Sequence, residues 1–149
     1  MKNNGGLTLI ELTIVLAIIA IIAAITVPMF LLTTDRARLR GDIQSARVLQ
    51  NAMELYHAER GRAVAGANGS DAGVVITNLT NANYINPRNV ALQTENAVWR
   101  LYRGSITVNI TTSPDAVRNE AFQSLNAAEK TYVFGGIPAT VIPSPSPGP

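Results

Sequence analysis

The sequence predicts an α+β protein in which a long amino-terminal helix packs against a small antiparallel sheet. Two patterns support this fold class. An uncharged apolar segment at 12–34 leads into an amphipathic helical pattern, and a two-residue periodicity appears after residue 97. The 149 residues suffice for one domain of ordinary size, and a hydrophobic content of 47% supplies enough material for a core.

The apolar segment 12–34 contains 23 residues without a charged side chain. About 20 apolar residues in a helix span the hydrocarbon core of a bilayer, so the segment predicts one membrane-spanning helix. A buried helix of a soluble protein is an alternative, but such a helix usually keeps a polar stripe. A cleavable secretory signal is another, although its apolar region is only about 7–15 residues long.

The residues before this segment include one basic residue, Lys2, a pair of glycines that ends at Gly6, and a carboxylate, Glu11. A carboxylate within a membrane helix costs about 2.5–3.5 kcal/mol on insertion scales, so Glu11 needs a partner or contact with water. Cleavage between Gly6 and Leu7 would create an α-amino group one helical turn from Glu11. An interfacial Glu11 that touches only water is the alternative.

Residues Gly5 to Ile25 resemble the class III signal of type IV pilins and type II secretion pseudopilins. The shared features are a short basic leader that ends in glycine, the sequence Thr-Leu-Ile-Glu and an uninterrupted hydrophobic stretch. The resemblance implies that a prepilin peptidase cleaves after Gly6 and N-methylates Leu7, where phenylalanine is the commonest residue of the family. It also implies that Glu11 forms a salt bridge in assembly and that Pro28 kinks the helix.

The same resemblance implies a pilin-like homo-oligomeric filament, a membrane assembly platform and contact with inner-membrane lipid before assembly. The filament would then be extracellular or periplasmic. The positive-inside rule disagrees, because Arg36, Arg38 and Arg40 follow the span whereas only Lys2 precedes it. We give priority to the leader motif, which implies that the carboxy-terminal part is translocated.

Beyond residue 34 the helix is predicted to continue to Arg60 and to end at Gly61. Its apolar residues recur at intervals of three and four: Leu39, Ile43, Ala46, Leu49, Met53 and Tyr56, widened by Val48, Ala52 and Leu55. Pro28 and Gly41 are weak points in this helix. A helix of this length cannot bury itself in a small domain, so its first half needs lipid or other copies of the chain.

The rest of the chain predicts a small head. We expect a glycine-rich loop at 61–73, a short helix or turn at 79–84, and a hairpin at 98–111 that turns at Gly104-Ser105. A second helix at 113–130 and short strands at 131–134 and 139–142 follow. The predicted divisions are a leader (1–6), a membrane and assembly helix (7–34), its amphipathic half (35–61), a head (62–142) and a Pro/Ser tail (143–149).

Composition excludes several function classes. The chain has no cysteine and one histidine, His57, so disulfides, thiolate catalysis and Cys-based zinc sites are absent. The net charge of +2 is too small for a nucleic-acid interface. We expect no cofactor, no enzyme activity and no metal, since no acidic residue follows Glu129, where pseudopilins carry a calcium loop. Glycosylation-type sequons begin at Asn68, Asn78 and Asn109.

These observations favour a structural subunit that polymerises through its amino-terminal helix into a type IV pilus or a secretion pseudopilus. The sequence does not decide between these two systems. The alternative is a single-pass, membrane-anchored surface or binding protein that does not polymerise.

Overall fold

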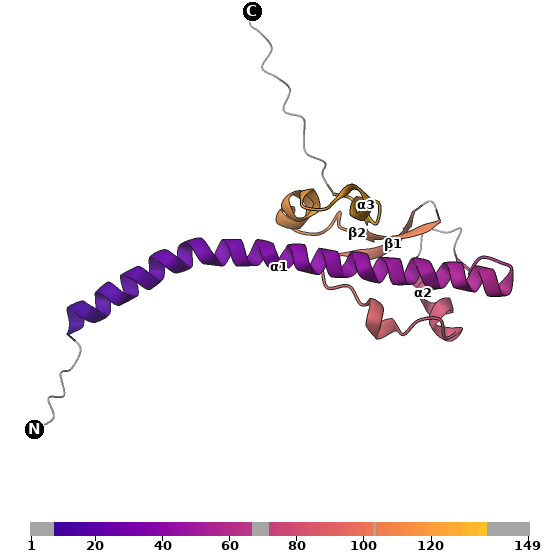
Figure 1. Ribbon diagram of the computed structural model, residues 1–149, viewed down its shortest axis with the longest axis horizontal. Helices are drawn as coiled ribbons and strands as arrows, with labels where there is room; N and C mark the ends of the chain where they lie inside the picture. Colours follow the sequence, from indigo (N-terminus) through magenta and orange to yellow (C-terminus); the bar gives the residue numbers. More distant parts are fainter. Residues whose placement is uncertain (1–7, 67–71, 103, 137–149) are drawn as a thin grey trace, which may run out of the picture.

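The computed structural model describes residues 8–66, 72–102 and 104–136. Its elements, in chain order, are α1 (Leu9–Arg60), α2 (Ala72–Asn81), the 3-10 turn η1 (Pro87–Val90), β1 (Val98–Tyr102), β2 (Ser105–Asn109), the π-helical turn η2 (Ala116–Ala121), α3 (Ala127–Lys130) and β3 (Val133–Phe134). In Figure 1, α1 extends far beyond the head, and all other elements gather around its carboxy-terminal half. The long helix packed on a small sheet confirms the predicted α+β fold class.

Helix α1 begins after the N-cap Thr8 and continues for 52 residues. It ends where the sequence predicted, because Gly61 adopts a left-handed conformation (φ 65°) and its amide donates to the carbonyl of His57. Pro28 lies inside the helix, and neither it nor Gly41 interrupts the helix. Figure 1 shows that α1 curves along its first half and is straighter beside the head. The kink at Pro28 itself stays a prediction.

The predicted hairpin is present, and its apolar residues pair across β1 and β2, with Leu101 opposite Ile106 and Trp99 opposite Val108. The prediction placed the turn at Gly104-Ser105, which is one residue too far along the chain. Tyr102 pairs with Ser105, so Ser105 is already part of β2, and Gly104 occupies the turn with φ 79°.

The sheet is mixed and not antiparallel throughout, because β3 joins β2 in parallel. The segment between these strands contains η2 and α3, and such a helical crossover returns the chain to the end where β2 began. β3 is therefore free to run in the direction of β2. The expectation of an antiparallel sheet was wrong for this third strand.

Two predicted helices of the head have different bounds. The helix expected at 113–130 is divided into two short helices, η2 and α3, because Asn126 starts a new helix by capping α3 in a reciprocal capping box with Glu129. The helix expected at 79–84 begins earlier, since α2 covers Ala72–Asn81. The predicted leader, the strand at 139–142 and the tail at 143–149 lie outside the described residues.

The core of the head has two clusters, both on one face of α1. The clusters are Leu39, Ile43, Ala46, Val108, Ile110, Val117, Ala121, Phe122 and Leu125, and Leu49, Ala52, Met53, Val64, Val75, Leu79, Val90, Leu101 and Ile106. Trp99 packs against both clusters. The predicted apolar stripe is therefore confirmed, including Ala52. Val48 and Leu55 do not widen it, because their side chains are 48% and 51% exposed.

Candidate functional site: the amino-terminal helix

The first half of α1 is apolar and has no packing partner in the described part of the chain. Its large hydrophobic side chains between residues 9 and 31 are all 49–81% exposed. A soluble monomer rarely exposes a contiguous apolar patch of more than a few hundred Å². Among the described residues, α1 is the one helix that is long and apolar enough to cross a membrane. The segment therefore fits anchoring in a membrane.

The polar side chains of this segment are satisfied inside the helix. The hydroxyls of Thr26, Thr33 and Thr34 each donate to the carbonyl four residues earlier, at 2.8–2.9 Å, and Thr13 donates to the carbonyl of Ile10 at 2.9 Å. A hydroxyl that is bonded within its own helix needs no water, which is the condition for a polar group in hydrocarbon. The threonines are therefore compatible with lipid on every side.

Glu11 lies in the first turn of α1, where it forms three hydrogen bonds with Thr8. The backbone amide and the hydroxyl of Thr8 both donate to Oε2 of Glu11, each at 2.7 Å, and the amide of Glu11 donates back to the Thr8 hydroxyl at 3.3 Å. This reciprocal capping box fixes the carboxylate at the helix amino terminus, where the helix dipole favours an anion. Its other oxygen, Oε1, receives no hydrogen bond from the described residues.

Sequence reasoning missed the contribution of Thr8. The pattern Thr8-Leu9-Ile10-Glu11 is a capping-box signature, Ser/Thr followed three residues later by Glu, and it was readable in the sequence. The predicted partner of Glu11, the α-amino group of Leu7, lies outside the described residues, as does Gly6. The structure therefore shows a first partner for the carboxylate and leaves the second as a prediction.

The three proposed glycosylation sites have different surroundings. Asn68 lies outside the described residues. Asn78 is half-buried on α2, and its Nδ2 donates to the carbonyl of Ala65 at 3.0 Å. Asn109 ends β2, and its Oδ1 accepts from the amide and the hydroxyl of Thr111 at 3.0 and 2.8 Å. Glycosylation at these residues stays a prediction.

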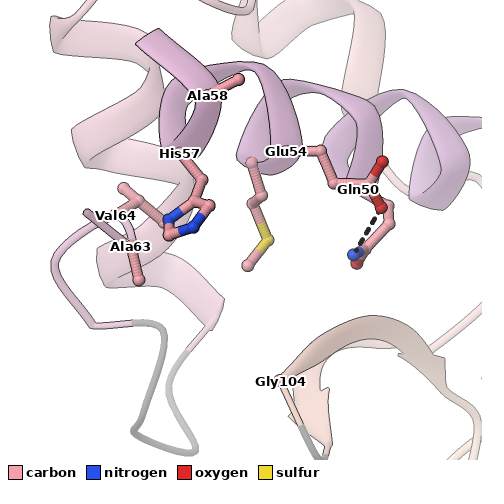
Figure 2. Close-up of a pocket in the computed structure, with 8 residues that line it drawn as sticks. Gln50, Glu54, His57, Ala58, Ala63, Val64 and Gly104 are labelled. Atoms are coloured by element: carbon pink, nitrogen blue, oxygen red, sulfur yellow. Dashed lines mark hydrogen bonds between the residues drawn. The ribbon is translucent and has the colours of Figure 1, made fainter. Parts of the chain in front are cut away.

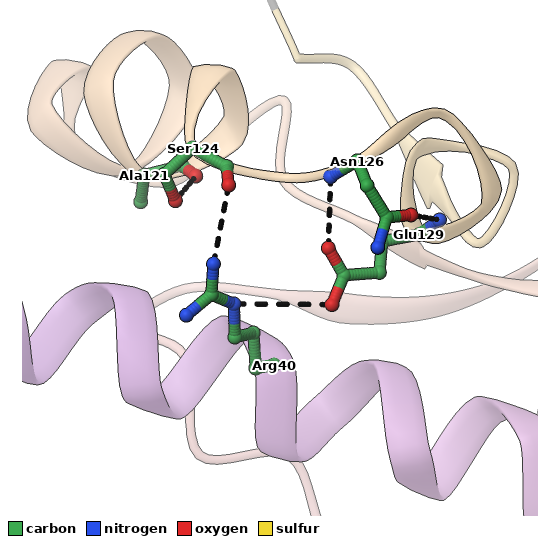
Figure 3. A network of polar contacts seen from close by, with 5 residues as sticks. All are labelled: Arg40, Ala121, Ser124, Asn126 and Glu129. Atoms are coloured by element: carbon green, nitrogen blue, oxygen red, sulfur yellow. Dashed lines mark hydrogen bonds and ion pairs between the residues drawn. The ribbon is translucent and has the colours of Figure 1, made fainter.

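The arginines after the apolar segment do not form one basic surface. Arg40 connects α1 to the head, since its guanidinium donates to the carbonyl of Ser124 at 3.1 Å and lies 3.8 Å from a carboxylate oxygen of Glu129 (Figure 3). The second oxygen of Glu129 accepts from the amide of Asn126 at 2.8 Å. Arg38 lies 3.8 Å from Asp35, one turn earlier on α1. Two of the three arginines are thus already engaged within the chain.

A second residue that sequence reasoning missed is Asp42, which is fully buried on α1. Its two carboxylate oxygens accept from the backbone amides of Gln93 and Thr94, each at 2.8 Å. The signal was its position, because residue 42 is spaced by three from Leu39 and by four from Ala46 and so lies within the apolar stripe. A carboxylate there predicts a buried partner. Asp42 anchors the segment before β1 to the helix.

The head also contains an open pocket of about 330 Å³ near the carboxy-terminal end of α1 (Figure 2). It is lined by Gln50, Met53, Glu54, His57, Ala58, Ala63, Val64 and Gly104. The carboxylate of Glu54 accepts a hydrogen bond from the side-chain amide of Gln50 at 3.2 Å. These lining residues include no serine, threonine or lysine nucleophile beside His57. Among the described residues, no group of three or more His, Asp or Glu side chains could hold a metal ion.

Two comparisons with known proteins found a match, and each match covers only part of this chain. Residues 1–27 match the family described as the prokaryotic N-terminal methylation motif. A protein of Clostridium perfringens (strain 13 / Type A), named prepilin peptidase-dependent protein A, is 44% identical over 58 residues. That stretch covers 39% of this chain and 41% of the relative, so the match spans less than half of either. No solved structure matches the chain. The chain thus carries a prokaryotic N-terminal methylation motif at residues 1–27 and is similar, over part of its length, to a prepilin peptidase-dependent protein.

Proposed function

We propose that this chain is a structural subunit that polymerises through α1 into a filament of the type IV pilus or pseudopilus kind. One observation carries the proposal. A single 52-residue helix is exposed and apolar in its first half, where Glu11 is the sole charged residue among positions 9–34, and carries a packed head on its second half. A membrane can cover the first half before assembly, and neighbouring helices can replace the lipid afterwards.

Processing is the first step of the proposed pathway. A prepilin peptidase would cleave after Gly6 and methylate the new amino group of Leu7, in agreement with the matched motif and with the printed name of the relative. Glycine offers the least obstruction to an enzyme that must approach the backbone. Both partners of the capping box, Thr8 and Glu11, remain in the mature chain after this cleavage.

Docking of each new subunit is the second step, on a membrane assembly platform. The α-amino group of Leu7 of one subunit would pair with Glu11 of its neighbour, and Oε1 is the oxygen that Thr8 leaves to that cation. A charge that enters an apolar filament core without a partner is strongly unfavourable, whereas a pair is tolerated. The pair would therefore select the register at which a subunit docks.

The alternative function, a single-pass anchored surface or binding protein, is favoured by one observation. The capping box gives Glu11 a role within its own helix, so the carboxylate has a structural reason to be there in a monomer. The two functions differ in what surrounds the apolar half of α1 in the mature protein. In the filament other copies surround it, and in the anchored protein lipid does.

Electron microscopy of the sheared surface and periplasmic fractions, combined with intact mass of the native protein, tests the proposal. We expect filaments that contain the chain, with a mass that begins at Leu7 and includes one added methyl group. A processed protein that stays wholly in the membrane fraction would support the anchored alternative. A mature chain that begins at Met1, or within the apolar segment, would contradict the processing step.

A further inference from the structure

The open pocket near the carboxy-terminal end of α1 combines a buried apolar surface with polar side chains. Its volume of about 330 Å³ is within the range of small-molecule sites, about 300–1,000 Å³. Met53 and Val64 supply the buried apolar lining, and their side chains are 8% and 3% exposed. Gln50, Glu54 and His57 supply the polar lining, and their spacing of four and three places them on one face of α1. Ligand sites have this composition, a mostly apolar wall with a few polar groups.

Glu54 is positioned at the pocket by two hydrogen bonds in series that begin in the sheet. The amide of Ile106 on β2 donates to Oε1 of Gln50 at 3.4 Å, and Nε2 of Gln50 donates to Oε1 of Glu54 at 3.2 Å (Figure 2). Because the side-chain oxygen of Gln50 accepts from Ile106, its NH2 group is the part that faces Glu54. A carboxylate has about four acceptor positions, and Gln50 uses one of them. Glu54 can therefore accept further hydrogen bonds from a ligand without releasing Gln50.

The charge of the lining favours a cation. Among the described residues that line the pocket, Glu54 is the one acid and none is a lysine or an arginine. Arg60, the next arginine along α1, is engaged elsewhere, because its guanidinium lies 5.7 Å from the ring centre of Tyr56. His57 in its neutral form adds one acceptor nitrogen. An anion would be repelled by Glu54, and a neutral molecule would gain nothing from its charge, whereas a cationic donor gains both attraction and hydrogen bonds.

Small residues keep the space open. Ala58, Ala63 and Gly104 complete the lining, and none has a side chain larger than a methyl group. Gly104 lies in the hairpin turn with φ 79°, a conformation that favours glycine, so the backbone explains its small size. Ala63 is exposed in the segment after α1, so a larger side chain at this position would enter the pocket without displacing the core.

We propose that this pocket binds a small organic cation, an ammonium or guanidinium group on an apolar stem. The charged group donates to Glu54 and His57, and the stem lies against Met53 and Val64, where it releases water from apolar surface. The flexible and polarizable thioether of Met53 adapts to aliphatic and aromatic stems. A free amine and the side chain of a lysine or arginine in another polypeptide share this chemistry. The proposal goes beyond filament formation and does not depend on it.

Methyl NMR of the methionines in the full-length protein in detergent tests the class of ligand. Met53 lines the pocket, whereas Met29 lies in the exposed apolar half of α1 and reports partition of a probe into the detergent. The probes are 2-phenylethylamine, the uncharged 2-phenylethanol and the anion phenylacetate. We expect the amine to shift the Met53 signal with a Kd of about 1 mM, and the alcohol to bind at least about fivefold more weakly. Equal binding of the three probes would overturn the proposal.

Matched variants test the residues. Glu54→Gln removes the charge and keeps an acceptor, so it should weaken binding of the amine about fivefold and leave binding of the alcohol unchanged. Glu59→Gln, a glutamate of the same helix outside the lining, should change neither. Ala63→Phe should fill the pocket and abolish binding, whereas Ala65→Phe, in the same segment but outside the lining, should not. Parental affinity in Glu54→Gln contradicts the site even if Ala63→Phe fails to fold.

A fourth probe, Nα-acetyl-lysine amide, distinguishes the two sources of the cation, because it presents a lysine side chain as a polypeptide does. Tighter binding of 2-phenylethylamine assigns the pocket to free amines, and tighter binding of the lysine derivative assigns it to a polypeptide side chain. If neither cation shifts Met53, or if only Met29 responds, the proposal is overturned. That result would leave the filament function standing, because assembly is proposed to depend on the first half of α1.

Discussion

The two halves of α1 share one continuous backbone but depend on different surroundings. Between residues 9 and 31 every large hydrophobic side chain is exposed, whereas Leu39, Ile43 and Leu49 in the second half are at most 1% exposed. The head supplies the partners of the second half. The first half must find its partners outside the chain, in lipid or in other copies. The same kind of substitution should therefore change assembly in one half and folding in the other.

The polar contacts of α1 also differ between its two halves. In the first half each described threonine hydroxyl bonds a carbonyl of its own helix, so no polar contact leaves the segment. In the second half Asp42 reaches across to the amides of residues 93 and 94, and Arg40 reaches to Ser124 and Glu129. A helix that must move between lipid and a protein core cannot rely on such cross-links, whereas a helix that carries a head requires them.

The largest effect is expected at Glu11. Glu11→Ala should reduce filament yield at least about tenfold, because removing one member of a buried charge pair typically costs about 3–5 kcal/mol and leaves an unpaired amine. Membrane insertion should persist or improve, since a charge has left the apolar segment. Filaments in the surface fraction and monomer retained in the membrane are quantified for each variant.

The control for Glu11 is Thr8→Val, which removes the hydroxyl that binds Oε2 but keeps the carboxylate. If Glu11 acts through the neighbouring amine, Thr8→Val should assemble far better than Glu11→Ala. Equal losses from the two variants would show that the capping box, and not an intermolecular pair, is what assembly requires. Glu11→Asp, which shortens the reach of the carboxylate by one methylene, should assemble poorly.

Matched leucine truncations sharpen the comparison between the halves. Leu49 is fully buried in the head, so Leu49→Ala should lower the free energy of unfolding by about 2–5 kcal/mol. Leu16 is 56% exposed, so Leu16→Ala should leave that free energy nearly unchanged and act on assembly instead. The single tryptophan, Trp99, packs against both core clusters and reports unfolding of the head by fluorescence in detergent. A large loss of stability from Leu16→Ala would contradict the division.

Local patterns predicted most of the fold. The helical period identified the buried face of α1, Gly61 gave its end, and the two-residue period gave the hairpin. The direction of β3 could not be read, because it depends on how η2 and α3 return the chain to the sheet. The break between those two helices could have been anticipated from Asn126 and Glu129, which are spaced as a capping box. Pairing between distant segments was the part that local periodicity could not supply.

Only part of the candidate site could be predicted, because local sequence patterns do not show contacts between distant segments. The apolar run, Gly6 and Glu11 form a linear motif, which a single sequence displays completely. The partners of Asp42 and Arg40 are separated from them by 51 and 84 residues or more, so no local pattern revealed these contacts. The exposure of Val48 and Leu55 was also missed, because periodicity says that a residue is apolar without saying whether the chain itself covers it.

Asp42 should have the next largest effect on the head. Asp42→Ala leaves the amides of Gln93 and Thr94 without their acceptors, and each buried unsatisfied donor costs about 1–3 kcal/mol. Asp42→Asn keeps one acceptor oxygen and should lose less stability than Asp42→Ala. Denaturant unfolding of the full chain in detergent, followed by Trp99 fluorescence, measures both. An Asp42→Ala variant as stable as the parent would show that water replaces the carboxylate.

The smallest effect is expected at Arg40, the contact between α1 and the last part of the head. Its side chain is 53% exposed and lies 3.8 Å from Glu129, and a surface ion pair of this kind contributes less than about 1 kcal/mol. Arg40→Met keeps the aliphatic stem and removes the charge, so the loss should stay within that limit and shrink with added salt. Arg38→Met is the control, because its partner Asp35 lies on α1 itself and the pair joins no second element. Equal losses from the two variants would show that the Arg40 contact does not hold the head to the helix. A loss at Arg40 that salt leaves unchanged would instead assign the effect to the hydrogen bond with Ser124.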